Sequence, residues 1–140
     1  MARVKLSKED NKYFTSYFDE DLDMYELFWN AESEHMEDEE YQSLMQEQRD
    51  AVIANNYTIE FFLLDNREFL FSMSPDLQEW QANEIFAKMV TKEVKIAVMV
   101  SSDFIAQLSI EQAIEEDDNA GETSKYFEDE QEAREWILGL

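Results

Sequence analysis

The sequence TIEFFLLDNREFLFSMSPDLQEW, residues 58–80, decides the fold more than any other stretch. Residues 59–64 are almost entirely apolar from Phe61 onward, which is typical of a strand that is covered on both faces, as parallel strands are. A polar and aromatic loop follows. Ser74 and Pro75 then signal a helix start, because the serine oxygen accepts a bond from a free amide and proline needs no partner in the first turn. The stretch predicts a buried strand, a loop and a capped helix.

The same order of strand and helix recurs downstream. Residues 96–100 (IAVMV) are a second uninterrupted apolar run, and Ser109 opens the pattern of a capping box that begins another helix. Residues 125–127 predict a short strand, and Asp129 predicts the cap of a last helix that ends before Gly139. Strands that alternate with helices imply crossover connections and a mostly parallel sheet.

The upstream part predicts a hairpin followed by a helix. Residues 13–18 and 24–29 read as two strands joined by the acidic turn DEDLD. In the second of them Glu26 lies between large apolar residues, and this alternation predicts a half-buried strand. Residues 41–53 repeat apolar side chains mostly at helical spacing. The expected fold class is therefore α/β, a mixed, mostly parallel sheet with an N-terminal β-hairpin and about four flanking helices.

The chain of 140 residues has the length of one domain. Residues 1–12 are polar, so we expect a flexible leader there and a single domain over residues 13–140. No apolar run approaches the ~18 residues that a membrane span needs, and the leader lacks the apolar middle of a signal peptide. The sequence therefore predicts no membrane span and a cytoplasmic location.

The net charge of -23, from 34 acidic and 11 basic residues, limits the partners. Nucleic acids and anionic membranes are bound through Lys and Arg, so we expect neither. The chain has no cysteine for thiolate chemistry and one histidine, which cannot build a multi-histidine zinc site. It also lacks Gly-rich phosphate loops and the G-x-S-x-G nucleophile motif. We expect a protein that is not an enzyme and that holds no metal or cofactor.

Polar residues follow the two buried strands, at the end of an open sheet where ligands bind in α/β proteins. If these strands are neighbours, the polar groups converge near Ser74 in one crevice; the alternative is that they satisfy loop amides and cap helices. The candidate crevice consists of Asp65, Asn66, Arg67, Ser101, Ser102 and Asp103.

The loop between Arg67 and Pro75 carries four large apolar side chains, Phe69, Leu70, Phe71 and Met73. Loops rarely expose so many, so these residues either seal the end of the core or contact another protein. That protein is a regulatory partner or a second copy of the chain. A rival of a different class is a pocket for a small apolar ligand, which the 14% of aromatic residues and the seven methionines are suited to line.

Three segments carry a resemblance to a known family: FFLLDNREFLFSMSPDLQEW (61–80), KIAVMVSSDFIAQLSIEQ (95–112) and YFEDEQEAREWI (126–137). They resemble the bacterial STAS/SEC14-type domains that are called SpoIIAA-like, small single-domain proteins mostly of unassigned role. The resemblance implies a mixed sheet flanked by helices and a non-catalytic, regulatory role through protein contact. Its SEC14 side implies a small apolar or lipid-type ligand as the alternative.

The same resemblance points to a regulatory serine. In the anti-sigma-factor antagonists of the wider STAS group, a partner kinase phosphorylates a serine at the start of the helix after the third strand, and Ser74 falls at that place. Those domains have an acidic residue before the serine and Ser-Gly after it, whereas here Met73 precedes Ser74 and Pro75 follows. Ser74 is thus either a plain helix cap or a phosphorylatable switch.

Overall fold

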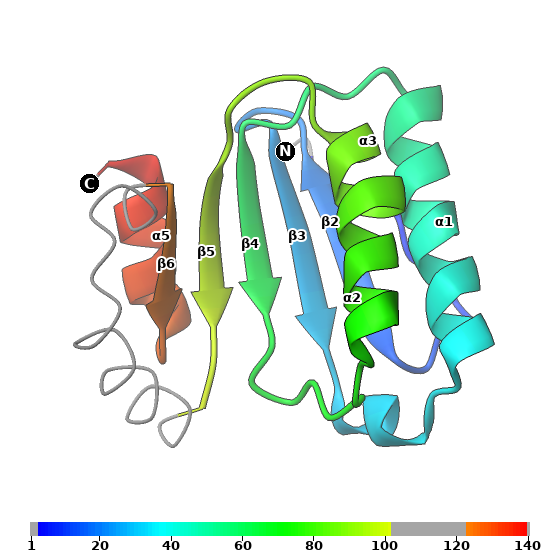
Figure 1. Ribbon diagram of the computed structural model, residues 1–140. Helices are drawn as coiled ribbons and strands as arrows, with labels where there is room; N and C mark the ends of the chain where they lie inside the picture. The colour runs from blue at the N-terminus through cyan, green and yellow to red at the C-terminus, as the bar shows by residue number, and fades with distance from the viewer. Residues whose placement is uncertain (1–2, 102–122, 140) are drawn as a thin grey trace.

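A computed structural model describes residues 3–101 and 123–139. Its six strands form one sheet in which they lie side by side in chain order (Figure 1). The strands are β1 Arg3–Lys5, β2 Phe14–Asp19, β3 Met24–Trp29, β4 Phe61–Asp65, β5 Lys95–Met99 and β6 Ser124–Phe127. The β1–β2 and β2–β3 pairs are antiparallel, and the pairs from β3 to β6 are parallel. The predicted α/β class, with its hairpin and mostly parallel sheet, is confirmed.

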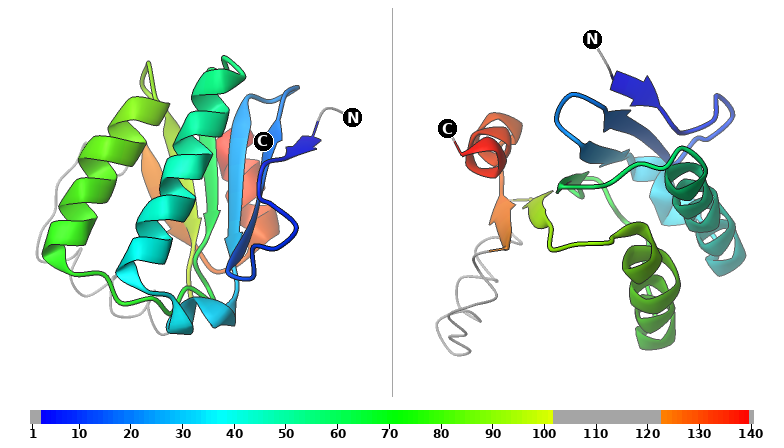
Figure 2. Two further views of the ribbon diagram at one scale, coloured as in Figure 1. Left: turned by 90° about the vertical axis from the view of Figure 1, so that its right-hand side faces the viewer. Right: turned by 90° about the horizontal axis from the view of Figure 1, so that it is seen from above.

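The helices lie in two layers, one on each face of the sheet. They are η1 Ala31–His35, α1 Asp38–Ala54, α2 Pro75–Trp80, η2 Gln81–Phe86, α3 Ala87–Met89 and α5 Glu130–Leu138. Because α2, η2 and α3 follow one another without a break, they form one continuous helix, named α2–α3 below. Helices α1 and α2–α3 cover one face and α5 the other (Figure 2). The described residues thus hold three flanking helices besides η1, and the helix expected from Ser109 lies outside the described residues.

The helix ends follow from local chemistry, as the sequence predicts. The Ser74 hydroxyl accepts a bond from the Leu77 amide at 3.2 Å, and Asp129 caps α5 in the same manner. Asn56 and Gly139 follow the ends of α1 and α5 with φ of 56° and 74°, in the left-handed region that asparagine and glycine tolerate best. These caps fix where α2–α3 and α5 begin, and so fix the loops that lead into them.

The structure places a strand inside the segment that we expected to be a flexible leader. Arg3–Lys5 forms β1 and pairs with β2, and the Leu6 amide extends the pairing to the Ser16 carbonyl at 2.9 Å. Only three residues long and exposed throughout, β1 has no apolar pattern for a sequence to reveal. Its pairing depends on the free edge of β2, and local sequence patterns do not show which strand will pair with that edge.

The expectation that β3 is half-buried is wrong. Glu26 is 1% exposed, because the side chains of Arg3 from β1 and Arg134 from α5 lie against it on the face of β3 that carries α5. On the other face of β3, which α1 covers, Tyr25, Leu27 and Trp29 belong to the hydrophobic core. A central strand of this mixed sheet is therefore buried on both sides, and its one carboxylate needs charged partners.

None of the helices in the described parts of the chain is long and apolar enough to cross a membrane.

Candidate functional site

The predicted crevice is divided between the two faces of the sheet. Strands β4 and β5 are neighbours, as the crevice hypothesis required. However, Asp65 and Arg67 bind each other through two bonds of 2.9 and 2.8 Å on the face that carries α5. The hydrogen bonds that Arg67 donates to Asp65 raise the pKa of Arg67, although burial opposes this. Both groups are thus engaged in a structural ion pair.

Asn66 does not join this pair. Asn66 follows Asp65 on the strand and its side chain turns to the opposite face, where it lines a cavity between the sheet and α1. Ser101 is exposed just beyond β5, and Ser102 and Asp103 lie outside the described residues. The convergence of carboxylates, hydroxyls and a cation that the sequence suggested is therefore not formed by Asp65, Asn66 and Arg67.

Ser74 occupies the position of a helix cap. Its side chain is exposed, and it accepts the bond from Leu77 that satisfies a free amide of the first turn. Pro75 fills the first helical position, as predicted. The geometry accounts for Ser74 without a partner kinase, and the phosphorylation hypothesis stays a prediction.

The candidate contact loop mostly seals the core. Phe71 is 9% exposed and stacks on Tyr41, with ring centroids 5.2 Å apart, and Phe69 packs against Trp29 at 4.5 Å. Met73 is half-buried against the same cluster. Leu70 differs, because 51% of it is exposed.

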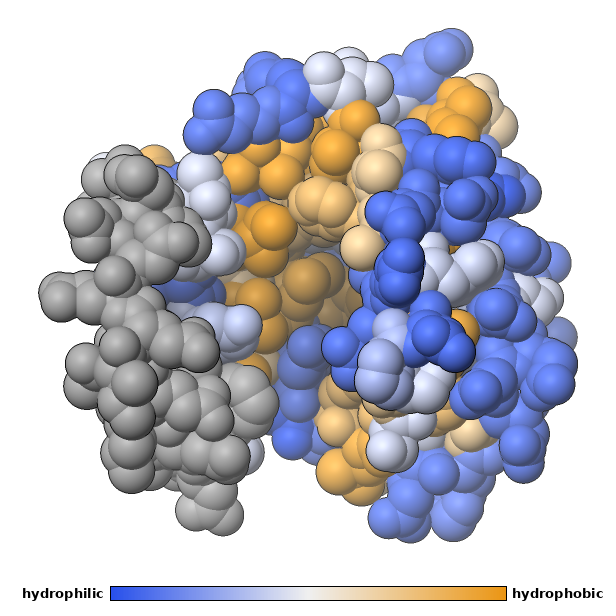
Figure 3. Space-filling model, viewed as in Figure 1, coloured by the Kyte–Doolittle hydropathy of each residue, from blue (hydrophilic) through white to orange (hydrophobic). Residues whose placement is uncertain are grey.

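A cavity with a volume of about 640 Å³ lies beside this loop. Its floor is the sheet and its walls are α1 and α2–α3; Figure 3 shows a hollowed, largely apolar area on this face. None of the described lining residues is charged. They are Tyr25, Leu27, Trp29, Tyr41, Met45, Gln48, Phe62, Leu64, Asn66, Phe69, Met73, Gln78, Gln81, Ile85, Phe86, Met89 and Tyr126.

A change in helix geometry shapes one wall of the cavity. Residues 81–86 form a π-helical segment, in which the Ala87 amide reaches back five residues to the Ala82 carbonyl. Such a segment inserts one extra residue into an α-helix and is found frequently at functional sites. Here it carries Gln81, Ile85 and Phe86, three neighbouring lining residues of the cavity. In a regular α-helix, residues i, i+4 and i+5 do not share one face as well as they do in a π-helical segment.

Polar groups interrupt the apolar lining on the α1 side. Gln48 is 3% exposed, and its amide oxygen accepts bonds from the Ser16 and Tyr25 hydroxyls, each at 2.7 Å. Burial raises the pKa of Tyr25 and that of Tyr41 far above the ordinary range, so both phenols are neutral at physiological pH. The cavity thus offers uncharged hydrogen-bonding groups in an apolar setting.

The sequence does hold a signal for these groups, although we did not predict them from it. Gln48 occupies the helical stripe of Tyr41, Met45 and Val52, all of which face the core. A carboxamide inside an apolar stripe is a polar group that must find a buried partner. Such a residue marks a candidate network or binding site.

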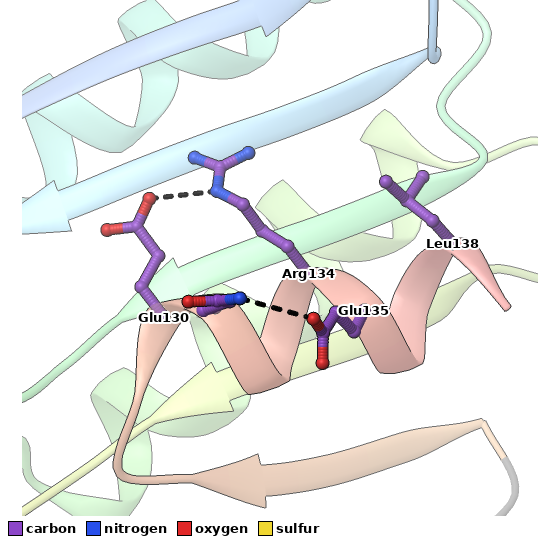
Figure 4. Close-up of a pocket in the computed structure, with 5 residues that line it drawn as sticks. Glu130, Arg134, Glu135 and Leu138 are labelled. Carbon is purple, nitrogen blue, oxygen red and sulfur yellow. Dashed lines mark hydrogen bonds and ion pairs between the residues drawn. The ribbon is translucent and has the colours of Figure 1, made fainter. Parts of the chain in front are cut away.

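A second hollow, of about 370 Å³, lies on α5 at the other face of the sheet. Figure 4 shows Glu130, Arg134, Glu135 and Leu138 in its lining. Arg134 donates to Glu130 at 2.8 Å, and Glu135 accepts from Gln131 at 3.3 Å. The same arginine reaches Glu26 at 3.3 and 3.4 Å. Because its charges already satisfy one another, this hollow offers a ligand less than the cavity does.

Among the residues that the structure describes, no three His, Asp or Glu side chains are grouped to hold a metal ion.

Comparisons of the chain with protein-family models, with curated proteins and with solved structures found no match. Its function is therefore argued from its own residues.

Proposed function

We propose that this protein binds a small, predominantly apolar molecule in the cavity between α1, α2–α3 and the sheet. One observation carries the proposal: a space of about 640 Å³ is lined by apolar and aromatic side chains with a few uncharged polar groups. Ligand sites in proteins have this size and composition. This is the alternative that the SEC14 side of the resemblance implies.

The packing around the cavity supports a lasting space. The Arg49 guanidinium donates to the Glu84 carbonyl at 3.1 Å and joins α1 to the π-helical segment. On the sheet side, Trp29 is fixed between Phe14 at 4.9 Å and Phe69 at 4.5 Å. With its walls tied together in this way, the cavity resists collapse.

A dye titration tests the proposal. Nile red, which is neutral and apolar, should bind with a saturable rise in fluorescence at one molecule per chain. Gln81→Trp places a large ring in the cavity from a half-buried position and should weaken binding about tenfold or more. Asn83→Trp is the matched control, because Asn83 lies on the same segment but is exposed and does not line the cavity. Equal dye binding by the two variants, or no saturable binding by the wild type, contradicts the proposal.

A protein-contact role, acting as a non-catalytic regulatory module, is the second candidate. The observation that favours it is the presentation of Leu70, which is 51% exposed while the Leu70 amide donates to the Ser33 hydroxyl at 2.9 Å. An apolar side chain held outward on an anchored loop suits a contact with a partner protein or a second copy. Sedimentation of the wild type against Leu70→Asp tests the second copy, and an unchanged mass in both argues against a homodimer through this loop.

Two further hypotheses are also proposed. Membership of the SpoIIAA-like group is supported by the three sequence segments quoted above and by the α/β class of the fold. A phosphorylated Ser74 is supported by its exposed position at a helix start, and mass spectrometry of the protein from its native cells tests it. Absence of phosphate under every growth condition argues against the switch.

A further inference from the structure

The polar wall of the cavity presents hydrogen-bond donors that the protein itself leaves unused. The amide oxygen of Gln48 accepts hydrogen bonds from Ser16 and Tyr25, so the two hydrogens of its amide nitrogen remain available as donors. Within residues 3–101 and 123–139, this amide nitrogen forms no bond, and because no buried polar side-chain atom there lacks a partner, the nitrogen is accessible to solvent. Because two hydroxyl donors hold the oxygen in place, the direction of the NH₂ group is fixed.

Tyr41 offers a second unused donor on the same wall. It is 4% exposed, and its ring is stacked between Trp29 at 6.2 Å and Phe71 at 5.2 Å. In the described parts of the chain its hydroxyl, unlike that of Tyr25, forms no hydrogen bond with the protein. Because no buried polar side-chain atom of the described residues lacks a partner, this hydroxyl is accessible to solvent. A ligand that fills the cavity displaces the water from it, so a ligand group that accepts its hydrogen bond avoids the cost of leaving the hydroxyl unsatisfied.

The two donors are spread along α1. Tyr41 and Gln48 are seven residues apart, so their Cα atoms lie on one face of the helix about 10 Å from each other along its axis. Met45 lies between them and also lines the cavity. The wall thus has the order donor, apolar, donor, which matches an apolar molecule that bears polar atoms at its ends or along its length.

The charges of the chain act against an anion at this place. None of the described lining residues is a cation, and the whole chain carries a net charge of -23. Moving a carboxylate into such a space removes its hydration and gives no ion pair in return. A neutral carbonyl loses far less, because it accepts the bonds that Gln48 and Tyr41 offer.

We propose that Gln48 and Tyr41 select an uncharged ligand that carries a hydrogen-bond acceptor, such as a ketone, ester or amide, and discriminate against the corresponding acid. This inference rests on the proposed binding function and adds the chemical class of the ligand to it.

Three related two-ring probes test whether the cavity prefers a neutral acceptor. Benzophenone joins two rings through a carbonyl, diphenylmethane joins them through a methylene, and benzoylbenzoate adds a carboxylate to benzophenone. Their affinities are measured by displacement of Nile red from the full chain. Benzophenone should bind about fivefold or more tightly than diphenylmethane, and benzoylbenzoate should bind most weakly of the three.

Two variants test whether Tyr41 and Gln48 cause this preference for the ketone. Tyr41→Phe removes a hydroxyl that has no partner in the described residues, so the fold should be retained while the advantage of benzophenone over diphenylmethane falls severalfold. Gln48→Met removes the amide at nearly constant volume, and the hydroxyls of Ser16 and Tyr25, which interact with each other, remain as a pair. Tyr57→Phe is the control, because the Tyr57 hydroxyl bonds Glu20 and does not line the cavity.

Benzophenone also reports its own position. On irradiation its carbonyl takes a hydrogen atom from a nearby C–H bond, and the two carbon radicals combine, which leaves a covalent label on the neighbouring residue. Peptide mapping should find this label on lining residues such as Met45 or Met89.

The outcomes separate the two proposals. If the ketone and the hydrocarbon bind equally, or if the ketone keeps its full advantage in both Tyr41→Phe and Gln48→Met, the selection is refuted while the binding function stands. Tightest binding of benzoylbenzoate also refutes the selection. If none of the probes displaces the dye and the label falls outside the cavity, the binding function itself fails.

Discussion

Replacing Arg134 with methionine should destabilise the protein more than the partial exposure of this side chain suggests. Arg134 is 30% exposed, but its partner Glu26 is 1% exposed and lies between Arg134 and Arg3, which reaches it at 2.6 Å. Arg134→Met preserves the apolar stem that packs on the sheet and removes only the charge and the hydrogen bonds. The buried carboxylate then keeps one cation instead of two.

The size of the effect lies between two limits. Removing one member of a fully buried ion pair costs roughly 3 to 5 kcal/mol, whereas an exposed pair contributes about 1 kcal/mol or less. Because Arg134 is partly exposed and Arg3 stays in place, we expect a loss of about 2 kcal/mol in the free energy of unfolding, midway between these limits. In a chain of this length such a loss lowers Tm by about 6 to 8 °C.

Urea unfolding followed by circular dichroism measures this loss. Glu130→Gln is the control, since it removes the exposed partner of Arg134 and should cost about 0.5 kcal/mol. In a Glu26→Gln background, Arg134→Met should cost clearly less than in the wild type, because the buried charge that it compensates is gone. The reasoning is refuted if Arg134→Met costs no more than Glu130→Gln, or if its cost is the same in both backgrounds.

Three further changes test the fold around the site. Ser74→Ala should cost about 1 kcal/mol in urea unfolding because it removes the cap of α2–α3, and Ser74→Asp should retain most of the stability; equal losses would show that the cap is unimportant. Phe71→Asp should unfold much of the protein at room temperature while Leu70→Asp leaves Tm nearly unchanged, because only Phe71 is buried, and similar melting curves would contradict this packing. Burial raises the pKa of Tyr25 and of Tyr41, so the fold favours their neutral forms: stability is intact below pH ~10, where phenols ordinarily titrate, and falls as the pH rises further. Ultraviolet absorbance should therefore show these two phenols ionising only together with unfolding, and their ionisation in the folded protein would overturn this.

The elements of this fold were predictable because their signals are local. Apolar runs predicted β4 and β5. The residues Ser74, Asp129 and Gly139 predicted helix ends to within one residue of the ends in the structure. Each of these signals involves residues within one helical turn or one strand, so it can be recognised from neighbouring residues in the sequence. The parallel arrangement of β3 to β6 followed from the alternation of strands and helices.

The candidate site was less predictable, for two physical reasons. The alternation of side chains along β4 sends Asp65 and Asn66 to opposite faces, so neighbours in sequence do not share a crevice. Gln48 meets Ser16 across 32 residues, and no local pattern states which distant hydroxyl a buried amide will meet. The loop from Arg67 to Pro75 was expected to carry any contact, yet most of its apolar groups complete the core.

The sequence alone determined the α/β class, the positions of α1, α2–α3, α5 and the main strands, and the acidic, cysteine-free chemistry that disfavours nucleic acids and thiolate sites. Only the tertiary structure decided that Glu26 is buried between Arg3 and Arg134, which are 23 and 108 residues away in the chain. It also decided that two helices and one face of the sheet enclose a cavity of about 640 Å³. The physical reason is that capping and strand formation depend on neighbouring residues, whereas a cavity or a buried ion pair depends on how whole elements lie against one another.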